Sequence, residues 1–146
     1  MKTVAGNRRA MFDYEITEKI EAGIILSGPE VKSCREGHVQ LAGAYVSLRS
    51  GTAVIKGMKI SHYKYAGPLP DYDPAHDRIL LLKKSDIERL SSAEQEKGVA
   101  IVPLEVRAGR YIKVVIGLGK GRKRMDKRSR IKERDIDRRL KQGKEY

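Results

Sequence analysis

Short blocks of alternating apolar and polar residues run through most of the chain and predict a mainly β body. Residues 12–26 form the first block, which Gly23 interrupts, and they predict a long, curved first strand with a bend or bulge. Pro29 occupies a first helical position and Gly37 follows a last one. The two residues therefore bound a predicted helix of about two turns over 29–36.

The rest of the body continues this pattern of short elements. Residues 44–48 and 53–55 flank a Ser-Gly turn and predict a hairpin, and the Pro-, Gly- and Asp-rich segment 65–77 predicts a long loop. Further strands are predicted over 79–82, 99–106 and 111–118, and further helices over 85–90 and 92–97. Ser85, with a glutamate three residues later, is the predicted N-cap of the first of these helices.

About six short strands without long alternating helices predict a small closed or partly open antiparallel barrel, because a sheet of this size must hide its edges. An oligonucleotide-binding barrel with short peripheral helices fits this pattern. The spacing of strands and turns fits an SH3-like barrel equally well. Periodicity alone therefore predicts the class of fold and leaves its type open.

Charge divides the chain into two unequal parts. Its 146 residues have a formal charge of +12, of which +4 falls on residues 1–119 and +8 on residues 120–146. We therefore predict an RNA-binding body over 1–121 and a basic tail over 122–146. The glycine-rich segment 117–121 lacks the serine or threonine of a phosphate-binding loop. We interpret it as a flexible exit segment that leads from the last strand of the body into the tail.

The tail has few apolar residues, but its charges are spaced for a helix. Residues 122–142 contain neither Gly nor Pro, and Asp126 and Arg130 are one of three pairs at i,i+4 spacing. Such pairs contribute roughly 0.2 to 0.5 kcal/mol each, which does not offset the cost of ordering the chain. We expect a tail that is disordered when free and helical when phosphates neutralise its cations.

Several classes of protein and site are disfavoured. No apolar run approaches the roughly 20 residues of a membrane-spanning helix, and no secretory signal opens the chain, which favours a cytoplasmic protein. The single Cys34 has no partner for a disulfide and reads as a small apolar side chain. The three histidines are scattered, so neither a metal site, a cofactor nor an enzyme is expected.

Candidate RNA contacts in the body are cations and aromatic side chains. Lys32 and Arg35 share a face of the predicted helix at a spacing of three residues. Tyr63, Tyr65 and Tyr72 gather around the long loop, where they can stack on unpaired bases. For any one tyrosine the commoner role is packing at the rim of a barrel with its hydroxyl in water.

Several motifs in a fixed order then resemble one known family. They are Asn7-Arg8-Arg9-Ala10, Glu21-Ala22-Gly23-Ile24, Gly28-Pro29-Glu30-Val31-Lys32-Ser33-Cys34-Arg35-Glu36-Gly37, Asp73-Pro74 before Leu80-Leu81-Leu82, Ile116-Gly117-Leu118-Gly119-Lys120-Gly121 and Asp126-Lys127-Arg128. Together they resemble the small protein B family of SsrA-binding proteins from about Asn7 to Leu140. The resemblance implies an oligonucleotide-binding barrel that holds the tRNA-like part of transfer-messenger RNA. It also implies a tail that docks on the small ribosomal subunit and its rRNA. We expect the protein to be a monomer.

The resemblance, together with the charge pattern, selects the candidate site residues. The expected RNA-binding residues of the body are Asn7, Arg8, Arg9, Glu30, Lys32, Ser33, Arg35, Leu81, Lys83 and Lys84. Glu30 is expected to hold local geometry rather than touch phosphate. The expected ribosome-binding residues of the tail are Lys120, Arg122, Lys123, Asp126, Lys127, Arg128, Lys132 and Arg134.

The chain also departs from the family pattern. His76 and Ile79 stand where basic residues are usual, Lys83 where Asn or His is frequent, Met125 where His or Tyr is frequent and Ile136 where Trp is frequent. These differences weaken the case for RNA contact by the long loop and for stacking by the tail. An alternative function is a general RNA chaperone or a ribosome-associated protein of the same barrel class, which binds by charge alone.

Overall fold

Nine strands and three helices follow one another in the computed structural model, which describes residues 2–121. They are β1 (Lys2–Gly6), α1 (Arg8–Asp13), β2 (Tyr14–Ile24), α2 (Gly28–Arg35), β3 (Val39–Gln40), β4 (Tyr45–Arg49), β5 (Thr52–Lys56), β6 (Lys59–Ile60), β7 (Arg78–Leu81), α3 (Lys84–Gln95), β8 (Val99–Ala108) and β9 (Ile112–Gly121). The predicted states of the tail over 122–146 lie outside the described residues.

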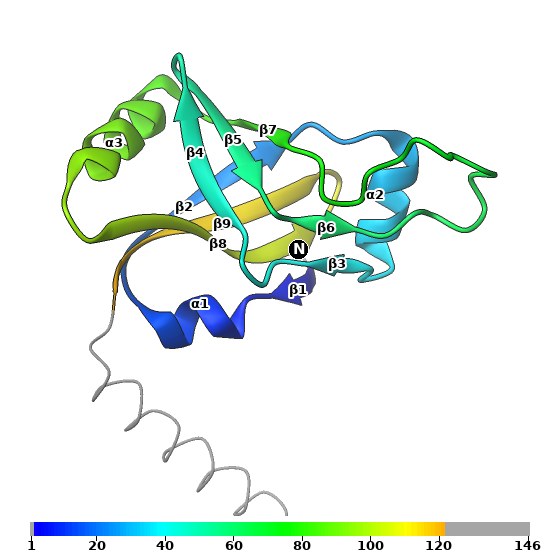
Figure 1. Cartoon of the computed structure of the whole chain (residues 1–146), viewed down its shortest axis with the longest axis horizontal. Helices are drawn as coiled ribbons and strands as arrows, with labels where there is room; N and C mark the ends of the chain where they lie inside the picture. The colour runs from blue at the N-terminus through cyan, green and yellow to red at the C-terminus, as the bar shows by residue number, and fades with distance from the viewer. Residues whose placement is uncertain (1, 122–146) are drawn as a thin grey trace, which may run out of the picture.

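Seven strands form one curled antiparallel sheet. Their order is β1-β8-β9-β2-β7-β5-β4, while β3 and β6 pair separately. The sheet curls until β4, at one edge, packs against β8 (Figure 1), yet these strands do not share a hydrogen-bonded ladder within residues 2–121. The expectation of an antiparallel barrel of the oligonucleotide-binding type with short peripheral helices is confirmed, and of the closed and partly open forms the barrel takes the partly open one.

The first strand begins later than predicted, because residue 12 lies in helix α1. Asn7 starts this helix: its side-chain oxygen accepts a hydrogen bond from the Ala10 N–H at 3.2 Å. The Asn7 amide also donates to the carbonyls of Leu41 at 3.3 Å and Pro103 at 2.8 Å. Both of these carbonyls come from segments distant in sequence, so alternation near residue 12 gave no sign of the helix.

A single helix, α3, replaces the two short helices predicted over 85–90 and 92–97. Leu90 and Ala93 are both buried, and α3 packs against β8. This continuous buried side stabilises the helix across Ser91, the single residue between the two predicted helices. The predicted N-cap is also wrong, because Lys83 occupies that position and makes no side-chain capping bond.

The glycine-rich segment 117–121 is part of strand β9, so its interpretation as a flexible exit is wrong. A Cβ atom on Gly119 would lie 2.7 Å from the Cβ of Tyr14, and one on Gly117 would lie 2.8 Å from Leu104 Cδ1. Real side chains do not approach so closely. These glycines therefore allow residues of β2 and β8 to pack over the neighbouring strand β9.

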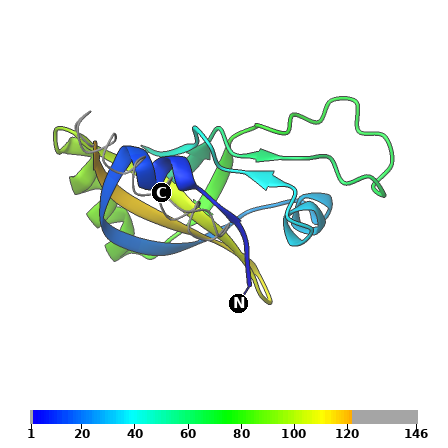
Figure 2. The ribbon, with the colours of Figure 1, turned by 90° about the horizontal axis from the view of Figure 1, so that it is seen from below.

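The loop before β7 projects from the barrel beside α2 (Figure 2). The predicted hairpin, the helix near residues 29–36 and the strands near 79–82, 99–106 and 111–118 are confirmed as β4 and β5, α2, β7, β8 and β9. Strands β1, β3 and β6 were not predicted. Each pairs with a strand far away in sequence or is only two residues long, and such elements leave little local pattern.

Candidate nucleic-acid interface

Helix α2 begins with a reciprocal capping box. Ser27 Oγ accepts from the Glu30 N–H at 3.4 Å, and Glu30 Oε1 accepts from the Ser27 N–H at 3.1 Å. Pro29 occupies the first turn, where its missing N–H costs no helical hydrogen bond. This local chemistry fixes the Glu30 backbone and one of its carboxylate oxygens.

The other oxygen of Glu30 meets a buried arginine. Oε2 accepts from Arg78 Nη2 at 2.6 Å and from Arg78 Nε at 2.8 Å. The Arg78 side chain is fully buried, and Glu30 is only 5% exposed. Burial raises the pKa of Glu30, but the Ser27 N–H and the Arg78 guanidinium lower it more, with help from His76, so that it falls to about 2. The ion pair is therefore fully charged at neutral pH.

Arg78 also holds the long loop against α2. Its guanidinium donates to the carbonyls of Met58 at 2.7 Å and Pro74 at 2.9 Å. From the same loop, the Tyr72 hydroxyl lies 3.2 Å and His76 Nε2 2.9 Å from Glu30 Oε2. We call Glu30, Tyr72, His76 and Arg78 the clasp. Through the clasp, Glu30 connects the start of α2 to the long loop.

The remaining predicted residues of α2 differ in exposure and in contacts. The Lys32 ammonium is exposed and lies 5.8 Å from the centre of the Tyr63 ring. Ser33 is buried, and its hydroxyl donates to the Ser61 carbonyl at 2.8 Å. Arg35 donates to the carbonyls of Gly109 at 2.8 Å and Arg110 at 3.2 Å. Helix α2 thus joins the long loop to the turn between β8 and β9.

The three predicted residues near the N-terminus do not form one surface. Asn7 is buried and caps α1, as described above. Arg8 and Arg9 are exposed on α1, and Arg9 Nε lies 3.6 Å from Asp13 Oδ2. Figures 1 and 2 both show α1 and α2 on separate parts of the barrel. Asn7 therefore has a structural role, whereas the two arginines remain accessible.

The other predicted contacts lie at a third place, around the end of β7. Leu81 is 56% exposed, and Lys83 and Lys84 are exposed at the start of α3. Lys120 is exposed near the end of β9, opposite Glu15 of β2. The other predicted tail residues lie outside the described part of the chain. They are Arg122, Lys123, Asp126, Lys127, Arg128, Lys132 and Arg134.

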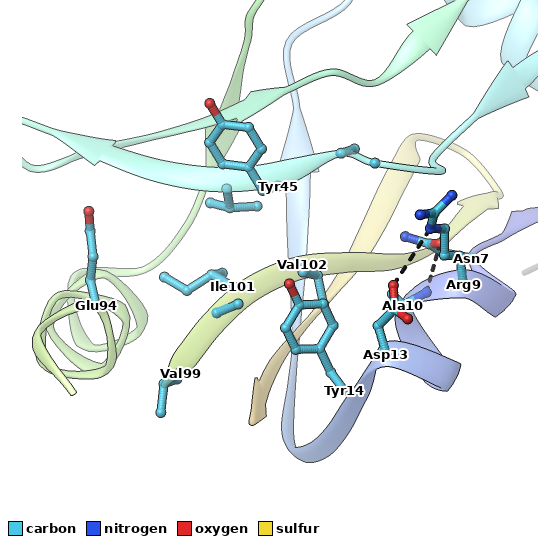
Figure 3. A pocket seen from close by; sticks show the side chains of 14 residues that line it. Asn7, Arg9, Ala10, Asp13, Tyr14, Tyr45, Glu94, Val99, Ile101 and Val102 are labelled. Atoms are coloured by element: carbon cyan, nitrogen blue, oxygen red, sulfur yellow. Dashed lines mark hydrogen bonds and ion pairs between the residues drawn. The ribbon is translucent and has the colours of Figure 1, made fainter. Parts of the chain in front are cut away.

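A cleft of about 400 Å³ lies at the open seam of the barrel (Figure 3). Tyr14, Tyr45 and residues 99–102 of β8 line it, together with charged side chains. Asp13 and Glu94 place two carboxylates in this lining, while its arginine is paired with Asp13. These carboxylates disfavour phosphate, so the cleft is a poor nucleic-acid site.

Sequence reasoning missed the central role of Arg78. The sequence carries no clear signal, because residues 79–82 are all apolar; only in the structure do Arg78 and Leu80 lie on the buried side of β7 while Ile79 and Leu81 are exposed. A charged residue at an inward position requires a partner, because an unpaired buried charge is very costly. The inward position that requires an acidic partner is therefore visible only in the folded chain, where that partner is Glu30.

No helix within residues 2–121 is long and apolar enough to cross a membrane. The same stretch of chain holds no group of three or more His, Cys, Asp or Glu side chains placed to bind a metal. Its cysteine, Cys34, is buried, and burial raises the thiol pKa to about 11.

Comparison with known proteins places these features in a family. A family model described as SmpB protein matches residues 4–145, nearly the whole chain. This chain belongs to the SmpB protein family. An SsrA-binding protein of Prochlorococcus marinus is 46% identical over 141 residues, covering 96% of this chain and 86% of the relative. Another, from Coprothermobacter proteolyticus, is 46% identical over 142 residues, covering 96% of this chain and 95% of the relative.

The fold is also shared with a solved SmpB structure. A chain from the work described as "tmRNA-SmpB: a journey to the center of the bacterial ribosome" superposes with a TM-score of 0.69. It is 37% identical, and the match covers 87% of this chain and 93% of the other. The resemblance read from the ordered motifs is thus confirmed over both sequence and fold.

Proposed function

We propose that this chain binds transfer-messenger RNA and delivers it to stalled ribosomes in trans-translation. Membership of the SmpB family over nearly the whole chain carries this proposal. Relatives at 46% identity are SsrA-binding proteins, and the matched solved structure concerns SmpB with transfer-messenger RNA and the bacterial ribosome. The protein then acts as a non-enzymatic, monomeric RNA carrier in the cytoplasm.

The charges of the body support binding to RNA. Arg8, Lys32, Lys83 and Lys84 are exposed, and none makes an ion pair within residues 2–121. Their charges are therefore available to phosphates, whose binding releases counterions. In contrast, the buried Arg78 is paired with Glu30 and unavailable. We assign phosphate contact to the unpaired cations and structural roles to Asn7, Glu30 and Ser33.

A binding experiment separates this function from that of a charge-driven RNA chaperone. Affinity for transfer-messenger RNA is compared with affinity for an unrelated structured RNA of equal length, at two salt concentrations. Lys32→Glu should weaken binding to transfer-messenger RNA, whereas the matched Lys97→Glu, also exposed and far along the chain, should not. Equal weakening by both variants, with no preference between the RNAs, would support charge-only binding and overturn the proposal.

The proposal assigns ribosome binding to the tail, which lies outside the described residues. Its cations would meet rRNA, and the ordering cost would be offset as phosphates neutralise them. Ile136→Pro should then reduce ribosome rescue without changing RNA binding by the body, because Pro in a helix interior costs about 3 kcal/mol. Ile136→Ala, which keeps helix propensity, is the control. Full rescue by the proline variant would contradict a helical tail on the ribosome.

A further inference from the structure

Two tyrosines of the projecting loop form an exposed aromatic pair. The rings of Tyr63 and Tyr65 are arranged edge to face, with 5.4 Å between their centres. Tyr63 is partly buried beside α2, whereas Tyr65 is 72% exposed. Figure 2 shows this loop reaching away from the barrel. Most of the Tyr65 ring is therefore presented to solvent on a segment that other molecules can reach.

Tyr72, on the same loop, has a different environment. Its hydroxyl lies 2.7 Å from the Ile60 carbonyl and belongs to the clasp with Glu30 and Arg78. The packing role expected for a tyrosine at a barrel rim thus explains Tyr72. It does not explain Tyr65, because burying little of a large aromatic ring contributes little to folding.

Two lysines surround the aromatic pair with positive charge. Lys64 Nζ lies 4.8 Å from the centre of the Tyr65 ring, and Lys32 Nζ lies 5.8 Å from that of Tyr63. Both ammonium groups are exposed, and neither makes an ion pair within residues 2–121. An aromatic face next to free cations matches an unpaired nucleotide, whose base stacks while its phosphate meets the ammonium groups.

The loop is also held in place before any ligand arrives. Arg78 binds the Pro74 carbonyl from within the clasp, and Ser33 of α2 binds the Ser61 carbonyl at the start of the loop. Holding both ends reduces the entropy lost when a ligand orders the loop. This anchoring favours a binding role for the side chains that the loop presents.

We propose that Tyr65, supported by Tyr63, is a stacking site for one unpaired base of a bound RNA, with Lys64 and Lys32 contacting its flanking phosphates. The proposal rests on the proposed function and adds to it a base contact on the loop, where the substitution of His76 for a basic residue had argued against RNA contact. The basic residue at that position is not needed, because the cations come from Lys64 and Lys32.

A fluorescence experiment tests the stacking directly. The chain contains no tryptophan, so Tyr65→Trp introduces a unique probe on the loop. Binding of transfer-messenger RNA should quench its emission strongly, because a stacked base lies against the indole ring. Tyr45→Trp, at an exposed tyrosine of β4, is the matched control and should stay unquenched. Binding with an unquenched Tyr65→Trp variant, or equal quenching in both, would overturn the stacking site and leave the proposed function intact.

Affinity measurements give a second test. Tyr65→Ala should weaken binding by about 5- to 150-fold, since stacking on one base contributes roughly 1 to 3 kcal/mol by alanine substitution. Tyr65→Phe should restore near-normal affinity, because the ring is retained. The slope of log affinity against log salt concentration should not change in Tyr65→Ala. In Lys64→Gln it should fall by the equivalent of about one phosphate contact. Unchanged affinity of Tyr65→Ala would refute the site. Lack of binding by the unmodified chain would refute both the site and the proposed function.

Discussion

Replacing Arg78 with methionine tests whether the clasp holds the fold together. Methionine retains apolar volume in the buried position but removes the guanidinium. The Glu30 carboxylate would lose its two shortest hydrogen bonds, at 2.6 and 2.8 Å, and the Met58 and Pro74 carbonyls would lose their donor. Since both Glu30 and Arg78 are almost completely buried, water cannot easily replace these bonds.

The size of the effect follows from two independent considerations. Removing one partner of a buried ion pair typically costs about 3 to 5 kcal/mol. The pKa of Glu30 is lowered from 4.5 to about 2, and at 1.36 kcal/mol per unit this corresponds to about 3 kcal/mol for all its partners together. We expect Arg78→Met to reduce the free energy of unfolding by about 3 kcal/mol, which lowers Tm by roughly 10 °C in a body of this size.

Urea and thermal unfolding of the full chain provide the assay. The single variants Arg78→Met and Glu30→Gln are compared with the double variant, which removes both charges. The double variant should cost less than the sum of the single ones by at least about 1 kcal/mol. Arg89→Met, which breaks the exposed ion pair of Arg89 with Glu18, is the control and should change the unfolding midpoint little.

The dependence on pH has a definite sign. Because the folded-state pKa of Glu30 is depressed, the carboxylate contributes fully to the free energy of unfolding above about pH 4.5. This contribution is lost as the pH falls toward 2. The stability difference between the unmodified chain and Glu30→Gln should therefore shrink over this range. In Arg78→Met, burial raises the pKa of Glu30, so acidification should relieve the defect. The stabilising role of the clasp would be refuted if the losses in unfolding free energy of the two single variants added up to that of the double variant. A loss below about 1 kcal/mol in Arg78→Met would refute it too.

Two further predictions concern other parts of the fold. Gly119→Ala should lower the free energy of unfolding by about 1 to 3 kcal/mol, because the new Cβ would lie 2.7 Å from that of Tyr14. Gly121→Ala should be neutral, because no atom lies within 4 Å of its Cβ. Urea titration of both variants measures the difference in unfolding free energy. Cys34 should resist thiol reagents at pH 8 in the native protein, because burial raises its pKa to about 11, and should react fully in denaturant. Rapid labelling of the native thiol would contradict its buried position.

Elements with a complete local signal were predictable. The hairpin of β4 and β5 has alternation on both sides of a turn, and Ser50 and Gly51 adopt the positive φ angles that such a turn requires. Helix α2 contains its own capping box between Ser27 and Glu30. Each signal lies within a few residues of the structure that it specifies, so tertiary contacts were not needed to read it.

Other elements depended on partners far away in the chain. Asn7 caps helix α1 with its side-chain oxygen, while its side-chain amide binds the carbonyls of Leu41 and Pro103 and so fixes the cap in place. Gly117 and Gly119 resembled a flexible segment, although their role is to accommodate the side chains of neighbouring strands. A glycine required by close packing and a glycine that gives flexibility have the same local pattern, so sequence could not distinguish them.

The sequence by itself determined the family, through the ordered motifs, and the mainly β body, through alternation. Only the tertiary structure decided which candidate residues are accessible to a partner. It buried Asn7, Glu30 and Ser33 and left Lys32 exposed, and it placed Tyr72 in the clasp but Tyr65 in solvent. The physical reason is that composition fixes which groups are present, whereas burial and hydrogen-bond partners arise from segments that meet only when the sheet curls.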